Sequence, residues 1–105
     1  MELLGDKMRV WVSSAAFVKP NSAVYVFYNR KKEAIYIGNS SNLEKTFSTY
    51  VETDFEGDEC KQKTQFYQRE FIENPKERQL QLIEEFQKET GNIPFCNAEI
   101  QIETR

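Results

Sequence analysis

The chain has 105 residues, of which 39% are hydrophobic and 30% are charged, so it is long enough for one modest core and too short for two. Its net charge of −3 at pH 7 gives the domain as a whole no electrostatic attraction to nucleic acid. Histidine is absent from the sequence, which excludes Ser-His and Cys-His nucleophile pairs and most zinc sites.

Three strands are predicted in the first part of the chain. Residues 8–12 alternate apolar and polar side chains, with β-branched and aromatic residues among them, and this predicts an N-terminal strand. Residues 23–28 and 34–37 predict two further strands, and the polar stretch 29–33 between them is typical of a hairpin loop. These two strands should pair antiparallel.

An amphipathic helix should follow the hairpin. Ser41 is suited to cap this helix, and Glu44 three residues later completes a capping-box pattern. Apolar side chains then recur at helical spacing on one stripe, at Leu43, Phe47, Tyr50 and Val51.

The next segment is acidic and then aromatic. Residues 52–59 carry several carboxylates whose spacing matches no calcium loop, so we expect a solvated loop. Residues 64–72 predict a fourth strand that presents Phe66 and Gln68 on one face and Tyr67 and Phe71 on the other.

A second helix should begin at Asn74-Pro75 and end near Gly91, because asparagine, proline and glycine favour these three positions. Residues 94–97 are expected to be irregular, and residues 99–103 should form a short terminal strand. The order of these strands and helices along the chain predicts an α+β domain with a small mixed or antiparallel sheet of three or more strands flanked by helices. The apolar side of the second helix should comprise Leu80, Leu82, Ile83 and Phe86.

The two cysteines, Cys60 and Cys96, form no Cys-x-x-Cys motif. We interpret them as buried or half-buried free thiols, with a disulfide or a reactive cysteine as the alternatives. No apolar run is long enough to cross a bilayer, and residues 1–7 lack the apolar region of a signal peptide. We therefore expect a cytoplasmic protein that does not associate with membranes.

Two tripeptides in the predicted hairpin carry a family resemblance. Ala23-Val24-Tyr25 and, after ten intervening residues, Tyr36-Ile37-Gly38 resemble the signature of GIY-YIG nucleases. The resemblance continues through Asn42-Leu43 and Tyr50 of the first helix and ends in Pro94-Phe95-Cys96-Asn97.

This resemblance covers about residues 22–97 and implies that residues 1–105 are a single GIY-YIG-like domain to which strand 8–12 is an addition. In that family one tyrosine acts on the attacking water, a second helps to position it, and an arginine holds the phosphate. A glutamate on a later helix binds one divalent metal ion. The resemblance implies a cleft that contains Tyr25, Tyr36 and Tyr50, with Mg²⁺ or Mn²⁺ in an active member.

The chain departs from the family pattern at both charged positions. The arginine position falls on Thr46, which supplies no cation, and the adjacent Lys45 points about 100° away around the helix. The metal position falls on Gln79 or, counted from the other direction, on Glu85, and Glu77 is the nearest candidate carboxylate. These departures predict that cleavage has been lost and that no cofactor is needed.

Three hypotheses about function follow. The first, which we favour, is a GIY-YIG-like scaffold without cleavage that binds nucleic acid or protein. The second is an active metal-dependent endonuclease whose arginine and glutamate have moved. The third is an interaction or assembly domain unrelated to nucleic acid. The oligomeric state stays open. Candidate binding residues are Asn39, Arg30, Lys45, Arg69 and Asn97.

Overall fold

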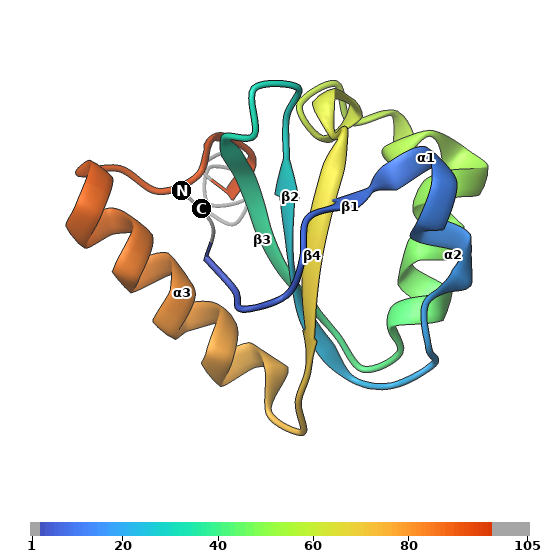
Figure 1. The fold of residues 1–105 in the computed structure, drawn as a ribbon, viewed down its shortest axis with the longest axis horizontal. Coiled ribbons are helices and arrows are strands. Elements are labelled where there is room, and N and C mark those ends of the chain that lie inside the picture. The colour runs from blue at the N-terminus through green and yellow to red at the C-terminus, as the bar shows by residue number, and fades with distance from the viewer. Residues whose placement is uncertain (1–2, 98–105) are drawn as a thin grey trace.

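The computed structural model describes residues 3–97, and within them a four-stranded sheet lies between two helical layers (Figure 1). The strand order is β1-β4-β2-β3, and every neighbouring pair is antiparallel. The predicted α+β class is therefore confirmed. The strands are β1 (Arg9–Val10), β2 (Ala23–Tyr28), β3 (Ala34–Ser40) and β4 (Phe66–Phe71).

Helices cover both faces of this sheet. Figure 1 shows α3 on one face and α1 with α2 on the other. The predicted terminal strand 99–103 lies outside the described residues. The helices are α1 (Trp11–Ser14), α2 (Leu43–Thr53) and α3 (Pro75–Thr90), and the 3₁₀ turns are η1 (Ala15–Phe17), η2 (Phe55–Gly57) and η3 (Lys61–Lys63).

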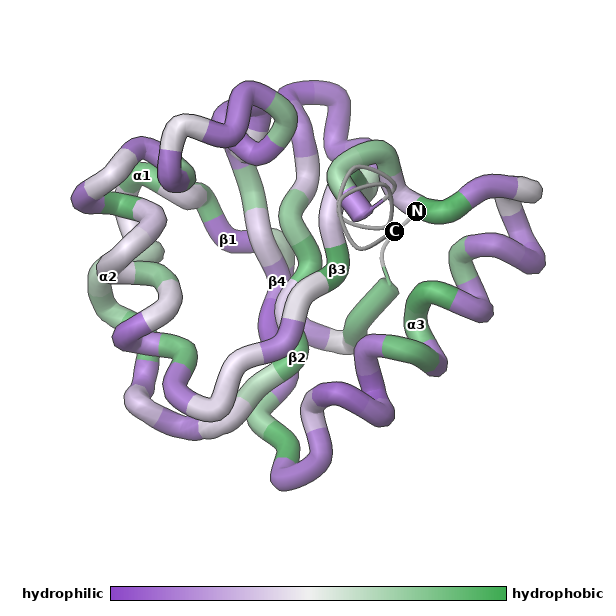
Figure 2. The backbone as a smooth tube through the Cα atoms, turned by 180° about the vertical axis from the view of Figure 1, so that it is seen from behind, coloured by the Kyte–Doolittle hydropathy of each residue, from purple (hydrophilic) through white to green (hydrophobic). Residues whose placement is uncertain are grey.

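Alternate residues of β2 enter two separate hydrophobic clusters, because successive side chains of a strand point to opposite faces. Since β2 is an inner strand with helices on both sides, its residues are all buried. Figure 2 shows the hydrophobic positions of β2 and β3 between the two helical layers. Ala23, Tyr25 and Phe27 belong to the cluster on the α2 side, and Val24, Val26 and Tyr28 belong to the cluster on the α3 side.

A β-bulge in β3 places Ile35 on the same face of the sheet as Tyr36. Phe27 pairs with Tyr36 whereas Tyr28 pairs with Ala34, so Ile35 is an extra residue in the ladder. Ile35 and Tyr36 consequently both belong to the cluster on the α2 side. Tyr36 shares the face of Tyr25 through the regular part of the ladder, in which Gly38 pairs with Tyr25 and Tyr36 pairs with Phe27.

The predicted N-terminal strand is present but shorter than residues 8–12. The chain turns into α1 at Trp11, and the Ser14 hydroxyl donates a hydrogen bond to the Val10 carbonyl at 2.8 Å. The indole of Trp11 packs edge-on against Phe27 and Phe47, with ring centroids 5.3 and 5.0 Å apart. Burial of this ring under α2 overrides the alternating pattern that predicted a longer strand.

Helix α2 begins one residue later than the predicted capping box requires. The cap is Asn42, whose Oδ1 accepts a hydrogen bond from the Lys45 amide at 3.1 Å, and Ser41 makes no such bond. The Ser40 hydroxyl accepts from the Asn42 amide at 3.0 Å and so fixes the turn from β3 into the helix. At the other end, Val51 is 49% exposed and lies outside the core stripe.

Helix α3 begins at Pro75 and ends at Thr90, close to the predicted end, and its C-cap Gly91 has the left-handed φ of 80° that favours glycine. Its predicted apolar side is wrong in one position. Leu82 is fully buried, but Leu80 is 62% exposed because two residues correspond to a rotation of about 200° around the helix. Residues 95–97, predicted to be irregular, have helical backbone.

Cys60 and Cys96 form a disulfide, so the interpretation as free thiols is wrong. The two Cα atoms are 5.7 Å apart although the residues are 36 positions apart in the sequence. No short-range spacing could indicate this pairing, because the fold alone brings the start of η3 beside the C-terminal turn. Among residues 3–97, we find no helix whose length and hydropathy would let it span a membrane.

Candidate functional site

The three predicted tyrosines converge on the α2 side of the sheet. Tyr25 comes from β2, Tyr36 from β3 and Tyr50 from α2, and all three belong to one hydrophobic cluster. The hydroxyls of Tyr25 and Tyr50 are 3.4 Å apart, and the rings of Tyr25 and Tyr36 have centroids 6.1 Å apart. These residues therefore lie together as the family resemblance implies, although each is at most 8% exposed.

Gly38 makes room for the ring of Tyr25. These two residues are cross-strand partners in β2 and β3. A Cβ atom at position 38 would lie 2.4 Å from Cζ of Tyr25, a separation that side chains do not tolerate. The glycine of the second tripeptide is thus needed because the phenol ring lies directly over its backbone.

The cation of this cluster is Lys61, which sequence reasoning missed. Its ammonium lies 4.3 Å from the ring centroid of Tyr36 and donates a hydrogen bond to the Tyr50 hydroxyl at 3.3 Å. The Asp58 carboxylate is 3.9 Å away, and Lys61 is only 8% exposed. No sequence signal marked this lysine, because a single lysine after a cysteine in an acidic loop fits no motif.

Arg69 is the cross-strand partner of Tyr25, but its guanidinium is engaged by a carboxylate. Arg69 pairs with Asp6, its Nη1 lying 3.0 Å from Oδ2. Arg78 pairs with Glu70 at 2.8 Å. Arg30 is exposed in the hairpin loop and Lys45 is exposed on α2. Thr46 supplies no guanidinium, and the guanidiniums of Arg69 and Arg78 are held by Asp6 and Glu70.

Thr46, at the predicted arginine position, completes the start of α2 instead. Its hydroxyl is 2.6 Å from the hydroxyl of Ser40, which also accepts the Asn42 amide. The side chain at position 46 is thus engaged in closing the β3–α2 turn.

Polar side chains near the Tyr36-Ile37-Gly38 tripeptide form hydrogen bonds with backbone groups at the free edge of β3. Asn97 pairs with both backbone groups of Ile37, accepting from its amide at 2.9 Å and donating to its carbonyl at 3.0 Å. Gln79 donates to the same carbonyl at 2.8 Å and accepts from Asn39 at 2.6 Å. Asn39, Gln79 and Asn97 therefore protect a strand edge that would otherwise be unpaired.

We expect Asn97→Ala to lower the free energy of unfolding by about 2 kcal/mol, because it leaves a buried amide of Ile37 without a partner. Urea unfolding followed by circular dichroism measures this change. The control is Asn21→Ala at an exposed position, for which we expect a change within about 0.5 kcal/mol. Equal losses in the two variants would show that Asn97 does not hold this edge.

The metal candidate Glu77 is exposed in the first turn of α3. Residues 3–97 contain no cluster of three or more Asp, Glu, Cys or His side chains that could hold a metal ion. Glu77 lines a hollow of about 340 Å³ that also includes Asn39 and Glu73. Of the two positions that the resemblance gives for the metal glutamate, Gln79 is hydrogen-bonded to Ile37 and Asn39, and Glu85 is exposed.

Burial raises the pKa of Tyr25 well above its ordinary value of 10.0, and the neighbouring Tyr50 and Tyr36 raise it further. Burial also raises the pKa of Tyr36, although the ammonium of Lys61 opposes this shift. Both phenols are therefore neutral at physiological pH. A phenol that is to accept a proton from water needs the opposite shift.

These raised pKa values predict a loss of stability at alkaline pH. The contribution of the neutral phenols is complete below pH 10.0, where the unfolded chain also keeps them protonated. Above that pH the unfolded chain ionises first, so the free energy of unfolding should fall as pH rises towards the folded pKa values. The urea midpoint measured between pH 8 and 11.5 should decline, and less steeply in Tyr25→Phe. Ionisation of all tyrosines near pH 10 in a protein that stays folded would contradict this expectation.

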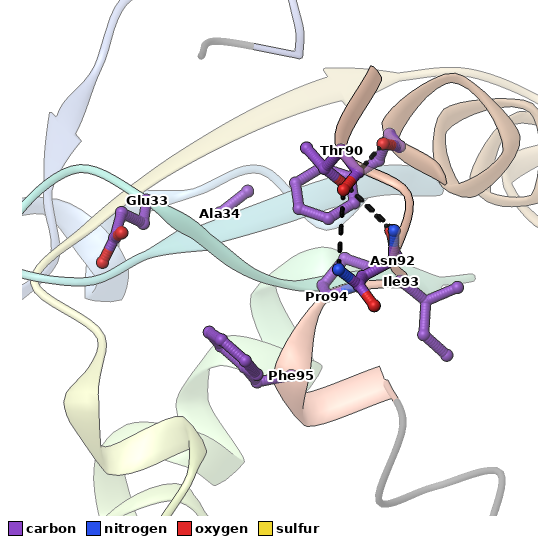
Figure 3. Close-up of a pocket in the computed structure, with 8 residues that line it drawn as sticks. Glu33, Ala34, Thr90, Asn92, Ile93, Pro94 and Phe95 are labelled. Carbon is purple, nitrogen blue, oxygen red and sulfur yellow. Dashed lines mark hydrogen bonds between the residues drawn. The ribbon is translucent and has the colours of Figure 1, made fainter. Parts of the chain in front are cut away.

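A separate hollow of about 300 Å³ lies away from the phenols, between the start of β3 and the C-terminal end of α3 (Figure 3). Phe95, 73% exposed, lines it together with Ile93 and Pro94. Of the described residues that line it, Glu33 is the only titratable one. This hollow therefore offers apolar contact and no group of catalytic residues.

No protein-family model matches the chain, and no curated protein matches it at a significant level.

Proposed function

We propose that this chain is a GIY-YIG-like domain that does not cleave phosphodiesters and acts as a protein-binding module. The observation that carries the proposal is the closed tyrosine cluster, in which the Lys61 ammonium lies over the ring of Tyr36 and bonds to Tyr50. The three phenols and the lysine are each at most 8% exposed. A scissile phosphate has no access to such a cluster.

The chemistry of hydrolysis supports the same conclusion. Cleavage needs a fixed cation for the transition-state charge, a metal-binding carboxylate and a phenol that can act on water. Thr46 at the arginine position and Gln79 at one of the two candidate metal positions are engaged in structural hydrogen bonds. Losing the cation alone typically raises the barrier by about 3 kcal/mol or more, a hundredfold to thousandfold in rate.

A cleavage assay tests the loss of activity. Single-stranded, duplex and branched DNA are incubated with the protein and Mg²⁺ or Mn²⁺, and the matched control is Tyr25→Phe. We expect no product above the level of the control. Cleavage that the Tyr25→Phe change abolishes would establish the alternative, an active metal-dependent endonuclease, and Lys61→Met would then test whether Lys61 is its relocated cation.

Exposed apolar side chains favour a protein as the partner. Val12 is 90% exposed and Phe17 is 85% exposed, and residues 10–18 contain no charged side chain. Large apolar side chains gathered on a surface are typical of protein contacts. The net charge of −3 also opposes binding to a polyanion.

Nucleic acid is the second candidate partner because one end of the sheet is basic. Arg30, Lys31 and Lys63 line a hollow of about 390 Å³ beside the hairpin, together with Asn29 and Glu33. If this tip binds phosphates, the affinity for single-stranded DNA should fall steeply as salt rises from 50 to 200 mM, and Lys31→Gln should flatten that dependence. Weak affinity that does not depend on salt would remove this candidate.

A further inference from the structure

We propose that the groove between α1 and the C-terminal end of α2, here called the α1–α2 groove, docks an amphipathic partner segment whose apolar side chains are flanked by lysine or arginine. This inference rests on the proposed protein-binding function and names its site and partner chemistry. Figures 1 and 2 show α1 and α2 side by side on the same face of the sheet. The described residues that line the groove are Trp11, Val12, Ala15, Ala16, Tyr50, Val51, Asp54 and Phe55.

The groove has a buried aromatic floor and an exposed aliphatic rim. Trp11, Tyr50 and Phe55 form the floor and are each at most 7% exposed. Val12 from α1 is 90% exposed and Val51 from α2 is 49% exposed, so the two rims present their side chains to solvent. The groove has a volume of about 260 Å³, which leaves space for an aliphatic side chain to enter between them. Burying these surfaces against a partner would be favourable.

The charged side chain among the described residues that line the groove is a carboxylate. Asp54 lines the groove, and Glu52 and Glu56 lie exposed on either side of Asp54 in the sequence. None of the three forms an ion pair with another residue in the described range 3–97. The last turn of α2 contains no basic residue, so the negative end of the helix dipole adds to the same field.

This field selects among the possible occupants. A second copy of the chain docked through the same groove would bring two sets of carboxylates together, because a two-fold interface places each patch against itself. Nucleic acid would be repelled for the same reason. A segment with lysine or arginine beside its apolar residues matches both the shape and the charge, as in helix-in-groove recognition.

The test uses designed helical peptides of 14 residues and the full chain. The first peptide carries leucines at positions i, i+3 and i+7 flanked by lysines. The second replaces every lysine by glutamate, and the third keeps the lysines and replaces every leucine by serine. Fluorescence anisotropy measures each dissociation constant, and backbone amide chemical shifts locate the contact. We expect the first peptide to bind at least tenfold more tightly than either of the others, with shifts confined to residues 11–17 and 50–56.

A variant of the protein that keeps every charge tests whether the exposed valines of the groove contact the peptide. Val12→Ser combined with Val51→Ser keeps every charge, and because both side chains are exposed it should fold normally. We expect this variant to bind the first peptide at least tenfold more weakly. An unchanged dissociation constant, equal binding of the glutamate peptide, shifts elsewhere on the surface, or self-association that the variant abolishes would each overturn the proposal. DNA cleavage by the same preparation would overturn the proposed function instead, so the two failures are distinguishable.

Discussion

Removing the Cys60–Cys96 disulfide will lower the free energy of unfolding by about 4 kcal/mol, a large part of the total stability of a domain of this size. The bond closes a loop between residues 36 positions apart, and loss of this restraint gives the unfolded chain more conformational freedom. Urea unfolding of Cys60→Ser combined with Cys96→Ser, compared with the oxidised protein, measures the loss. An oxidised protein treated with a reductant should approach the double variant.

The effect should reach the tyrosine cluster as well as the global stability. Cys60 precedes Lys61, and Cys96 precedes Asn97, so the bond holds the segments that place both side chains. Hydrogen exchange at the Ile37 amide, which donates to Asn97, should accelerate in the double variant by more than exchange in the rest of β3. Unfolding midpoints that do not differ between the oxidised and the double-variant protein would contradict both expectations.

Gly38→Ala should lower the free energy of unfolding by about 3 kcal/mol, because the added methyl group overpacks the core. The new Cβ would meet Cζ of Tyr25 at 2.4 Å, and that ring cannot easily move because it is itself packed against Phe27 and Phe47. Thermal and urea unfolding measure the change.

Two comparisons make this expectation specific to the contact with Tyr25. Gly5→Ala is the matched control, since a Cβ at that exposed position meets nothing within 4 Å, and its effect should stay within about 0.5 kcal/mol. Combining Gly38→Ala with Tyr25→Leu should cost less than the sum of the two single changes, because the smaller side chain leaves room for the methyl group. Strict additivity would show that the ring is not what excludes a side chain at position 38.

Local sequence signals predicted most of the fold. The hairpin strands, their polar loop and helix α3 follow from alternation, turn chemistry and the Asn-Pro start, all of which act within a few residues. The errors have long-range causes. Trp11 leaves the predicted strand because its indole fits under α2, and Leu80 faces solvent because α3 buries only one stripe. Pattern alone does not reveal which stripe a neighbour will cover.

Only the part of the candidate site that depends on residues close in sequence was predicted. The spacing of Tyr25, Tyr36 and Tyr50 predicted that the three side chains lie together, because a hairpin and the helix that follows it are close in sequence. Lys61 was missed because it arrives from a loop after α2, held there by a disulfide that no spacing indicated. The β3 bulge that places Ile35 on the same face as Tyr36 is also invisible in the sequence.

Nitration with tetranitromethane, followed by peptide mapping, tests most directly whether the phenol cluster is a closed core and not an open active site. All five tyrosines are at most 8% exposed, so the folded protein should leave Tyr25, Tyr36 and Tyr50 unmodified during a time in which the urea-unfolded chain is nitrated at every tyrosine. Rapid nitration of Tyr25 or Tyr36 in the folded protein would mean that solvent and a phosphate reach these phenols, and it would contradict the account of a domain that no longer cleaves.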